Sequence, residues 1–398
     1  MTGVLPTAGT VDLARARTAV VLAFGINGFC FASWLSRTPS ARDALQLSPV
    51  QLGLLLLCLS GGACVALPFS GPLVQRIGPA RTVLLGSVLM SVGLLAMAAG
   101  LAVRSVWPVA GGLLVTGLGN ASWDVAMNVA GADVERRRGR SLMPRLHAAY
   151  SLGTVASGGV GAGSAALGVP LAAQLVFAGA LAPVSMVFAV RWFLPPHEPE
   201  PLEASASPWG GLSVWREPRT LLIGVLTLGF AFTEGSANDW LAVAMADGHH
   251  AGEVLAAVGF AVFVTAMTIG RICGVALLDR FGRVAVLRAT ATVAVAGLLL
   301  VILSGSVLWA MVGALLWGLG ASLGFPVGMS AAADDPARAA ARVSVVSTIA
   351  YTAFLAGPPL IGLLAQHTGI LPAMYVVLAA LVVAALVCPA TRPPVDRT

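Results

Sequence analysis

The sequence predicts an all-α membrane protein with twelve transmembrane helices in two pseudo-symmetric six-helix bundles. Its composition is the first reason: 58% of its 398 residues are hydrophobic and 10% are charged, whereas soluble domains carry about 25% charged residues. The second reason is a succession of apolar stretches, each near the roughly 20 residues with which a helix spans a bilayer. The third is an internal repeat that relates the first half of the chain to the second.

The twelve expected spans follow one another along the whole chain. They lie at residues 17–38, 50–70, 81–102, 107–131, 144–166, 171–194, 219–241, 253–274, 285–304, 307–331, 343–366 and 372–388. The one long connection, residues 195–218, is rich in Pro, Glu and Ser, as flexible linkers are. We therefore expect one bundle over residues 1–194 and a second over residues 219–398. The start of the chain lacks the pattern of a cleaved signal peptide, so we expect the first span to be retained.

The distribution of arginine predicts the orientation. All 23 basic residues are arginines. With the N-terminus in the cytoplasm, Arg37, Arg42 and Arg104 fall on the outer side and the other 20 on the cytoplasmic side, as the positive-inside rule requires. Both termini and the linker are then cytoplasmic. Because the arginines lie in short loops, the sequence pI of about 9.6 reports topology, and we expect no nucleic-acid partner.

The repeat is clearest in two places. The segment at residues 117–133 returns 201 residues later at residues 318–334. The loop that contains Arg76 and Gly78 returns 204 residues later with Arg280 and Gly282. In transporters built from two parallel repeats, the binding site lies near the bilayer midplane where the repeats meet. We expect the same here.

The first copy of the repeated segment carries a polar stripe. Asn120, Asp124 and Asn128 recur at every fourth residue and so share one helix face. A carboxylate at the centre of a membrane helix costs about 2.5–3.5 kcal/mol on insertion scales and normally faces a bundle interior or a water-filled cavity. The second copy replaces the three with Ala321, Phe325 and Met329. The stripe predicts a site for a proton or a substrate amine, and the alternative is a polar packing contact between helices.

Other polar residues inside the spans are further candidates for substrate or proton binding. His147 opens the fifth span and Tyr150 follows one turn later, and histidine titrates near neutral pH. We expect His147 to approach Asn128 and Asp124. Glu234 and Asn238 lie one turn apart in the seventh span, and Asn27 lies in the first. Arg271, near the inner end of the eighth span, is expected to extend its side chain to the cytoplasmic surface.

The loop at Gly274–Arg283 carries a family resemblance. Its sequence, Gly-x4-Asp-Arg-Phe-Gly-Arg, between the second and third spans of a half, resembles the signature loop of the major facilitator superfamily. Three further phrases, at residues 34–39, 123–128 and 234–240, are similar to the bacterial MosC-like branch. The resemblance implies a transporter of the bacterial inner membrane. Two positions depart from the family pattern, since Gln75 stands where the first loop would have Asp and Leu113 where proton-coupled drug antiporters have Arg.

The charged residues of the two repeated loops are candidates for a conformational latch. Charges at cytoplasmic helix ends can pair in one conformation and separate in another, which biases the equilibrium between them. The candidates are Arg76, Arg81, Asp279, Arg280 and Arg283. We expect Asp279 to pair with Arg338 or Arg342 at the start of the eleventh span. The alternative is that the arginines only report topology.

Together these features predict a secondary active transporter that works by alternating access with proton coupling. Buried acids without a cluster of buried arginines favour a small neutral or cationic solute. The expected partners are this solute, protons and the lipid bilayer, with no cofactor, no metal and a monomeric state. A pump for drugs or toxic metabolites and a non-transporting membrane sensor or scaffold remain open. A membrane-embedded enzyme is disfavoured, because the five histidines and five cysteines show no nucleophile–base or metal-ligand spacing.

Overall fold

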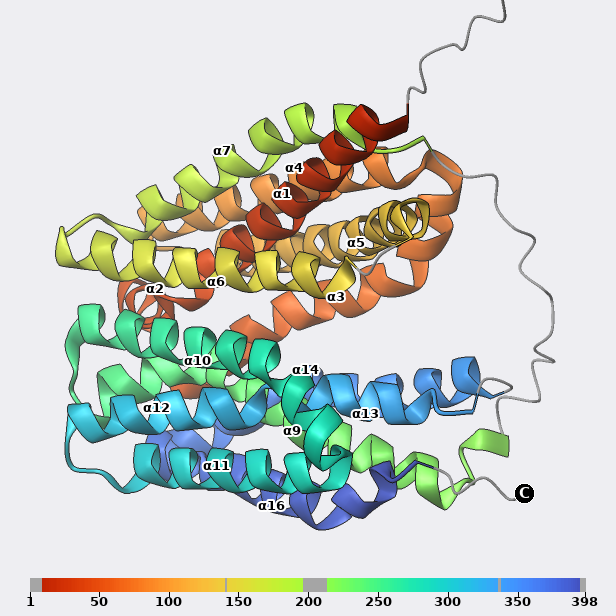
Figure 1. Cartoon of the computed structure of the whole chain (residues 1–398). Helices are drawn as coiled ribbons and strands as arrows, with labels where there is room; N and C mark the ends of the chain where they lie inside the picture. Colours follow the sequence, from red (N-terminus) through yellow and green to blue (C-terminus); the bar gives the residue numbers. More distant parts are fainter. Residues whose placement is uncertain (1–8, 140–141, 196–212, 336–337, 394–398) are drawn as a thin grey trace, which may run out of the picture. The chain divides into compact units, whose positions relative to one another are not determined.

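The computed structural model describes residues 9–139, 142–195, 213–335 and 338–393, and the described residues form helices and turns without a strand (Figure 1). Contacts divide the chain into two compact units. The first comprises Met1–Trp34, Cys58–Val160 and Leu167–Glu200, and the second Leu35–Leu57, Gly161–Ala166 and Pro201–Thr398. The predicted bundle limits at 194 and 219 stay predictions, and residues 196–212 of the predicted linker lie outside the described ranges.

The helices of the first unit follow the predicted spans. They are α1 Gly9–Leu35, most of α3 Pro49–Ile77, α4 Pro79–Ala102, α5 Val106–Arg138, most of α6 Met143–Ala166, and α7 Leu171–Ala189 with the 3-10 turn η1 Val190–Trp192. The N-terminus of α3 is a capping box, because the Gln51 side chain accepts the Ser48 N–H at 2.9 Å while the Ser48 hydroxyl accepts the Gln51 N–H at 3.3 Å. The side chains of Ser48 and Gln51 thus cap the start of this helix.

The second unit contains the remaining helices. They are α2 Thr38–Leu45, α9 Pro218–Val243, the π turn η2 Ala244–Gly248, α10 Gly252–Phe281, α11 Arg283–Leu303, α12 Val307–Ala321, α13 Gly324–Ala332, α14 Ala339–Thr368, α15 Ile370–Ala373, α16 Tyr375–Val387 and the 3-10 turn η3 Cys388–Thr391. Three features differ from the prediction. The short helix α2 was not expected, and the spans predicted at 307–331 and 372–388 are each divided into two helices.

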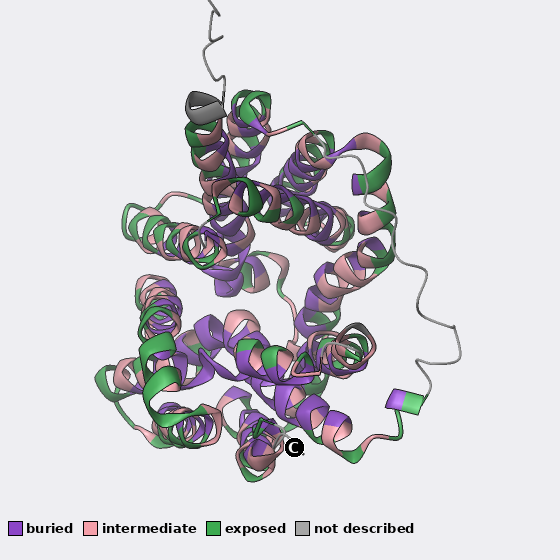
Figure 2. Cartoon of the chain, turned by 45° about the vertical axis from the view of Figure 1, so that its right-hand side comes forward, coloured by how far each residue is buried: buried purple, intermediate pink, exposed green. Residues whose placement is uncertain are grey.

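Ten helical segments in the described ranges are long and apolar enough to cross a membrane. The two predicted spans outside this set lie on α5 and α6, whose interiors carry polar residues such as Asp124 and His147. In Figure 2 many helices carry buried residues along one face and exposed residues along another. The all-α membrane fold is therefore confirmed.

The internal repeat is visible in the packing of glycines. A Cβ added to Gly112 of α5 would lie 2.6 Å from the Gly93 carbonyl oxygen of α4, and one added to Gly313 of α12 would lie 2.7 Å from the Gly297 oxygen of α11. Neither position has room for a side chain, because real Cβ atoms do not approach backbone oxygens so closely. Each glycine therefore lets two helices touch along their backbones, at corresponding places in the two repeats.

The two repeated loops also share a backbone conformation that favours glycine. Gly78, before α4, has φ 83° and ψ 160°, and Gly282, before α11, has φ 76° and ψ 163°. A residue with a Cβ rarely adopts positive φ. The glycine of the sequence motif thus makes the sharp turn between consecutive helices in both halves.

A single proline divides the tenth predicted span. The turn between α12 and α13 occupies Ser322 and Leu323, and Pro326 stands in the first turn of α13. Proline has no N–H, so it cannot bond to the carbonyl four residues earlier, and its ring crowds that carbonyl. The carbonyl of Ser322 is consequently free to accept a hydrogen bond from another helix.

Candidate functional site

The polar stripe of α5 lies in the first unit. Asn128 donates from its side-chain amide to the Asp124 carboxylate at 3.2 Å and to the Asp124 backbone carbonyl at 2.9 Å. The carbonyl oxygen of the Asn120 side chain is buried and has no partner among the described residues. Trp123, fully buried, packs where Gly86 of α4 admits it. The carboxylate thus has one amide donor in the middle of a 33-residue helix and an unused amide oxygen one turn away.

Helix α6 packs closely on α1 and positions His147 and Tyr150. A Cβ on Gly28 would overlap the Tyr150 backbone, so the two helices touch there. The His147 ring lies edge-on to Phe24 with centroids 5.4 Å apart, and the side chain is exposed. The predicted approach of His147 to Asp124 and Asn128 stays a prediction. Asn27 of α1 is fully buried, and neither amide atom has a partner among the described residues.

The second unit contains an ion pair between two membrane helices. Nη2 of Arg271 on α10 donates to both carboxylate oxygens of Glu234 on α9, at 2.9 and 3.0 Å. Nε of Arg271 donates to the Ser322 carbonyl at 3.3 Å. Asn238, one turn after Glu234, is half-buried. Arg271 was expected to reach the membrane surface, and this was wrong, because it lies ten residues from Phe281, about 15 Å along the helix, and turns inward to a carboxylate.

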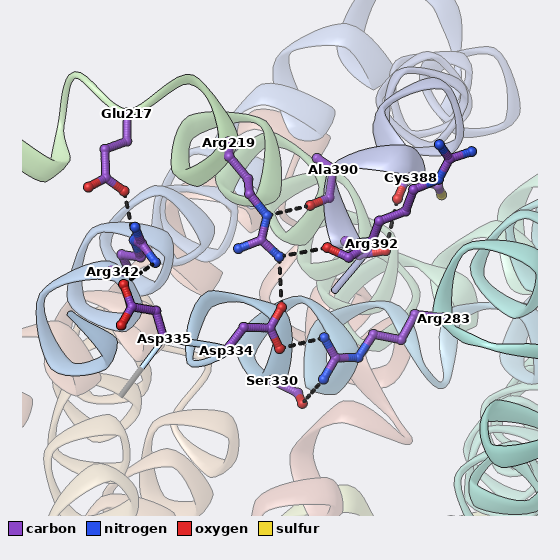
Figure 3. Close-up of polar contacts among 11 residues, drawn as sticks. Glu217, Arg219, Arg283, Ser330, Asp334, Asp335, Arg342, Cys388, Ala390 and Arg392 are labelled. Atoms are coloured by element: carbon purple, nitrogen blue, oxygen red, sulfur yellow. Dashed lines mark hydrogen bonds and ion pairs between the residues drawn. The ribbon is translucent and has the colours of Figure 1, made fainter. Parts of the chain in front are cut away.

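Charged residues gather at the predicted cytoplasmic end of the second unit (Figure 3). The Glu217 carboxylate accepts hydrogen bonds from Arg338 and Arg342, both at 2.7 Å, and from the Thr220 hydroxyl at 2.9 Å. These donors, Arg342 foremost, lower the pKa of Glu217 from 4.5 to about 2. Arg342 also reaches Asp335 at 3.2 Å. The start of α14 is therefore held to the start of α9 by charge.

Asp334 forms the second ion-pair centre at this end. It accepts from Arg219 at 2.7 Å and from Arg283 at 2.6 Å, and Arg283 also donates to the Ser330 hydroxyl at 3.1 Å (Figure 3). Arg283, a latch candidate, thus links the loop before α11 to the end of α13. A cluster of buried residues lies nearby along the chain, with Ile223, Ala331, Ala332 and Val346 in contact.

The other latch candidates are differently placed. Asp279 is exposed and has no ion pair in the described ranges. Its expected partners contact Glu217 instead, so the expected pairing is not present in this structure. Arg280 lies over the ring of Phe281 at 5.2 Å, and Arg76 and Arg81 are exposed.

Ion pairs also join helices at the opposite, predicted outer end. Arg37, next to the start of α2, has a side chain only 3% exposed and contacts Glu253 at the start of α10, and Ser40 of α2 donates to the same carboxylate. Arg42 of α2 contacts Asp247 of η2. A cavity of about 320 Å³ lies beside this second pair, lined mainly by apolar residues of α3, α9 and α15. All these residues belong to the second unit.

Comparisons with known proteins give consistent similarities. The sequence profile described as Major Facilitator Superfamily matches residues 18–334 and 235–398. An uncharacterised MFS-type transporter of Yersinia pestis is 32% identical over 87% of this chain and 88% of its own length. The membrane protein MosC of Rhizobium meliloti is 25% identical over 92% of this chain and 88% of its own. A solved structure of the nucleoside transporter NupG has a TM-score of 0.79, with 13% identity, over 94% of this chain and 99% of NupG.

Proposed function

Because the chain belongs to the major facilitator superfamily and resembles its MosC-like branch, we propose that it moves a small solute of neutral or positive net charge across the bacterial inner membrane. The transport is driven by protons and proceeds by alternating access. The observation that carries this proposal is the Asp124 carboxylate, placed in mid-helix with an amide donor from Asn128. A membrane helix rarely retains such a group unless it binds an ion, a proton or a substrate.

The proton and solute groups divide between the two units. In the first, Asp124 takes the proton or a cationic group of the solute, Asn120 and Asn128 supply hydrogen bonds, and His147 with Tyr150 and Asn27 complete the polar lining. In the second, Glu234 takes the proton or a polar group of the solute, and Asn238 supplies a hydrogen bond. The support is that each unit carries an acid in the middle of a span. An acid that is charged in one conformation and neutral in another couples proton movement to the conformational change.

Ion pairs at both helix ends support alternating access. The pairs Arg37–Glu253 and Arg42–Asp247 hold α2 to the predicted outer ends of α9 and α10, and we propose that they separate when the outer side opens. We retain the loop residues Arg76, Arg81, Asp279, Arg280 and Arg283 as a proposed cytoplasmic latch. Asp279→Ala should then shift the distance between spin labels on the cytoplasmic helix ends. An unchanged distance distribution would assign the loop to topology alone.

The test uses purified protein in proteoliposomes loaded with a pH-sensitive dye. Small solutes with no net negative charge are added in turn under an imposed pH gradient. We expect at least one solute to change the internal pH with the wild type, and Asp124→Asn to lower that rate by about 100-fold or more while the protein stays folded. A solute that moves protons equally well with Asp124→Asn would exclude this carboxylate as the coupling group.

His147 offers a second reading of the same assay. His147→Ala should flatten the dependence of the rate on pH around neutrality, because imidazole is the side chain that titrates there. His147→Gln keeps hydrogen-bonding groups but cannot titrate. If His147→Gln still accumulates the solute against its gradient, Asp124 or Glu234 carries the proton without the histidine.

A further inference from the structure

The ion pair between Arg271 and Glu234 has no net charge, and its guanidinium group is partly accessible. The Arg271 side chain is 33% exposed and that of Glu234 is 18% exposed. Nε and Nη2 of Arg271 have protein acceptors, whereas Nη1 has none among the described residues. Arginine presents its N–H groups as a planar fork that matches a carboxylate. The guanidinium is therefore held in place with part of its fork unused.

We propose that, when Glu234 takes up a proton, Arg271 binds a carboxylate group of the transported solute. The proton neutralises Glu234, Arg271 loses its counter-ion, and the carboxylate of the solute replaces it. One proton and one carboxylate arrive together, so the net charge of this part of the protein does not change. An arriving anion is thereby favoured only with a proton, because an unprotonated Glu234 keeps the guanidinium and repels a second carboxylate.

The break between α12 and α13 holds Arg271 while its partner changes. The Ser322 carbonyl, which has no helical partner because Pro326 lacks an N–H, accepts a hydrogen bond from Nε of Arg271. This bond does not involve Nη1, the nitrogen that has no protein acceptor among the described residues. Broken helices present such carbonyls at the binding sites of many transporters. The Arg271 side chain therefore keeps one fixed hydrogen bond when Glu234 is protonated, and its fork stays oriented.

Arg271 is the charged group whose contact with Glu234 the structure records. The elements packed against α9 carry other charged or titratable residues. Those on α9 and η2 are Arg219, Asp239 and Asp247; on α2, Arg42 and Asp43; on α10, Glu253, Cys273, Asp279 and Arg280; on α14, Arg342, Tyr351 and His367; on α16, Tyr375; on η3, Cys388; and α12 and α13 carry none. Arg219 lies fifteen residues before Glu234, about 22 Å along the helix, and its contacts are with Asp334 and the carbonyls of Ala390 and Arg392. Asp239 lies five residues from Glu234, about 7.5 Å along the helix. Protonation of Glu234 therefore acts first on Arg271.

This inference rests on the proposed function and narrows its substrate class. A solute with a carboxylate but no net negative charge also carries a cationic group. The expected solute is thus a small zwitterion.

Chemical labelling of Arg271 tests the proposal without requiring transport. Phenylglyoxal, which reacts with guanidinium groups, is applied to the purified full-length protein, and the labelling of each arginine is measured by peptide mass spectrometry. Glu234→Gln mimics the protonated acid, so Arg271 should react about tenfold faster than in the wild type. Arg288, exposed on α11, is the internal control and should react equally in both proteins.

Matched small molecules then test the class of ligand. In Glu234→Gln, glycine betaine should slow labelling of Arg271 at least about fivefold, whereas choline, which has a hydroxyl in place of the carboxylate, should not. Propanoate and propanamide form a second such pair. Equal labelling of Arg271 in the wild type and the variant would overturn the proposal. So would a failure of both glycine betaine and propanoate to slow the labelling, or equal protection by the analogues that lack the carboxylate.

Two controls keep the result interpretable. If Glu234→Gln does not fold, Glu234→Ala removes the same charge and takes its place. A protein that shows the expected labelling but no solute-driven proton movement would refute the proposed transport and leave the carboxylate site standing. The reverse result would refute only the carboxylate site.

Discussion

The two copies of the repeated segment, α5 and the pair α12–α13, share their packing but not their polar groups. Both approach the preceding helix through glycine, at Gly112 and Gly313. Helix α5 is continuous and carries Asp124 itself. The second copy has Pro326 where α5 has Val125, is interrupted at Ser322, and accepts its hydrogen bond from Arg271 of another helix. The glycine contacts are common to both copies. The charged residue lies on the helix itself in the first copy, and on the neighbouring helices α9 and α10 in the second.

This difference indicates how a duplicated fold can acquire two unlike polar centres. In α5 the acid is fixed by its own helix, one turn from its amide donor. In the second copy a missing N–H frees a carbonyl, and that carbonyl helps to hold an arginine from α10. The second centre consequently depends on three helices, and it should respond more strongly to changes in tertiary structure than the first.

Exchanging the residues that distinguish the copies should have unequal effects. Val125→Pro would remove an N–H and crowd the Ala121 carbonyl within a continuous helix, so it should lower the free energy of unfolding by about 3 kcal/mol. Pro326→Val would restore an N–H at an existing break and should change it by less than about 1 kcal/mol. Unfolding of both variants in detergent micelles gives the comparison. Equal losses would mean that the break is not set by Pro326.

The ion pair of the second copy should appear as an energetic coupling. Arg271→Ala leaves Glu234 without its partner and should lower the free energy of unfolding by about 2 kcal/mol. In the double variant with Glu234→Ala the two losses should not add, because neither charge is then left alone. Arg288→Ala, the loss of an exposed arginine, should change it by less than about 0.5 kcal/mol. Strict additivity of the single variants would show that the pair contributes no coupling.

The ion pairs at the helix ends should give a smaller effect that depends on pH. The pKa of Glu217 is lowered from 4.5 to about 2, so its charge stabilises the folded state above pH 4.5, and that contribution is lost as the pH falls from there toward 2. Because the residue lies near the surface, Glu217→Gln should cost only about 0.5–1 kcal/mol at neutral pH.

Thermal unfolding of both proteins across this range checks the sign. The difference between wild type and Glu217→Gln should narrow below pH 4.5 and be nearly absent near pH 2. A difference that stays constant over the range would show that the arginine contacts do not favour the ionised carboxylate.

Hydropathy predicted the helices well because the membrane imposes one length and one composition on every span. All twelve predicted spans coincide with helices. The short helix α2 was missed because Thr38–Leu45 mixes polar and apolar residues and has a proline in its first turn. The break in the tenth span had a signal, since Pro326 lies within the apolar run, but proline is tolerated in membrane helices often enough to obscure it.

Only some contacts of the candidate site residues could be expected from the sequence. The Asp124–Asn128 contact follows from spacing along a single helix, which the sequence displays directly. The partner of Glu234 could not be read in this way, because Arg271 lies 37 residues away on another helix and only the packing of α9 against α10 brings them together. Partners far apart in the sequence also explain why Asp279 was expected to pair with Arg338 or Arg342, whereas in the structure Glu217 pairs with both arginines.

The proposal that Asp124 and Glu234 each take up and release a proton can be tested by infrared spectroscopy of the protein in proteoliposomes as the pH is lowered. A carboxylic acid that gains a proton shows a carbonyl stretch, whose frequency depends on its surroundings. We predict two components from acids inside the membrane, one absent in Asp124→Asn and the other absent in Glu234→Gln. Spectra of both variants identical to that of the wild type would contradict proton binding at these carboxylates, and with it the proposed coupling.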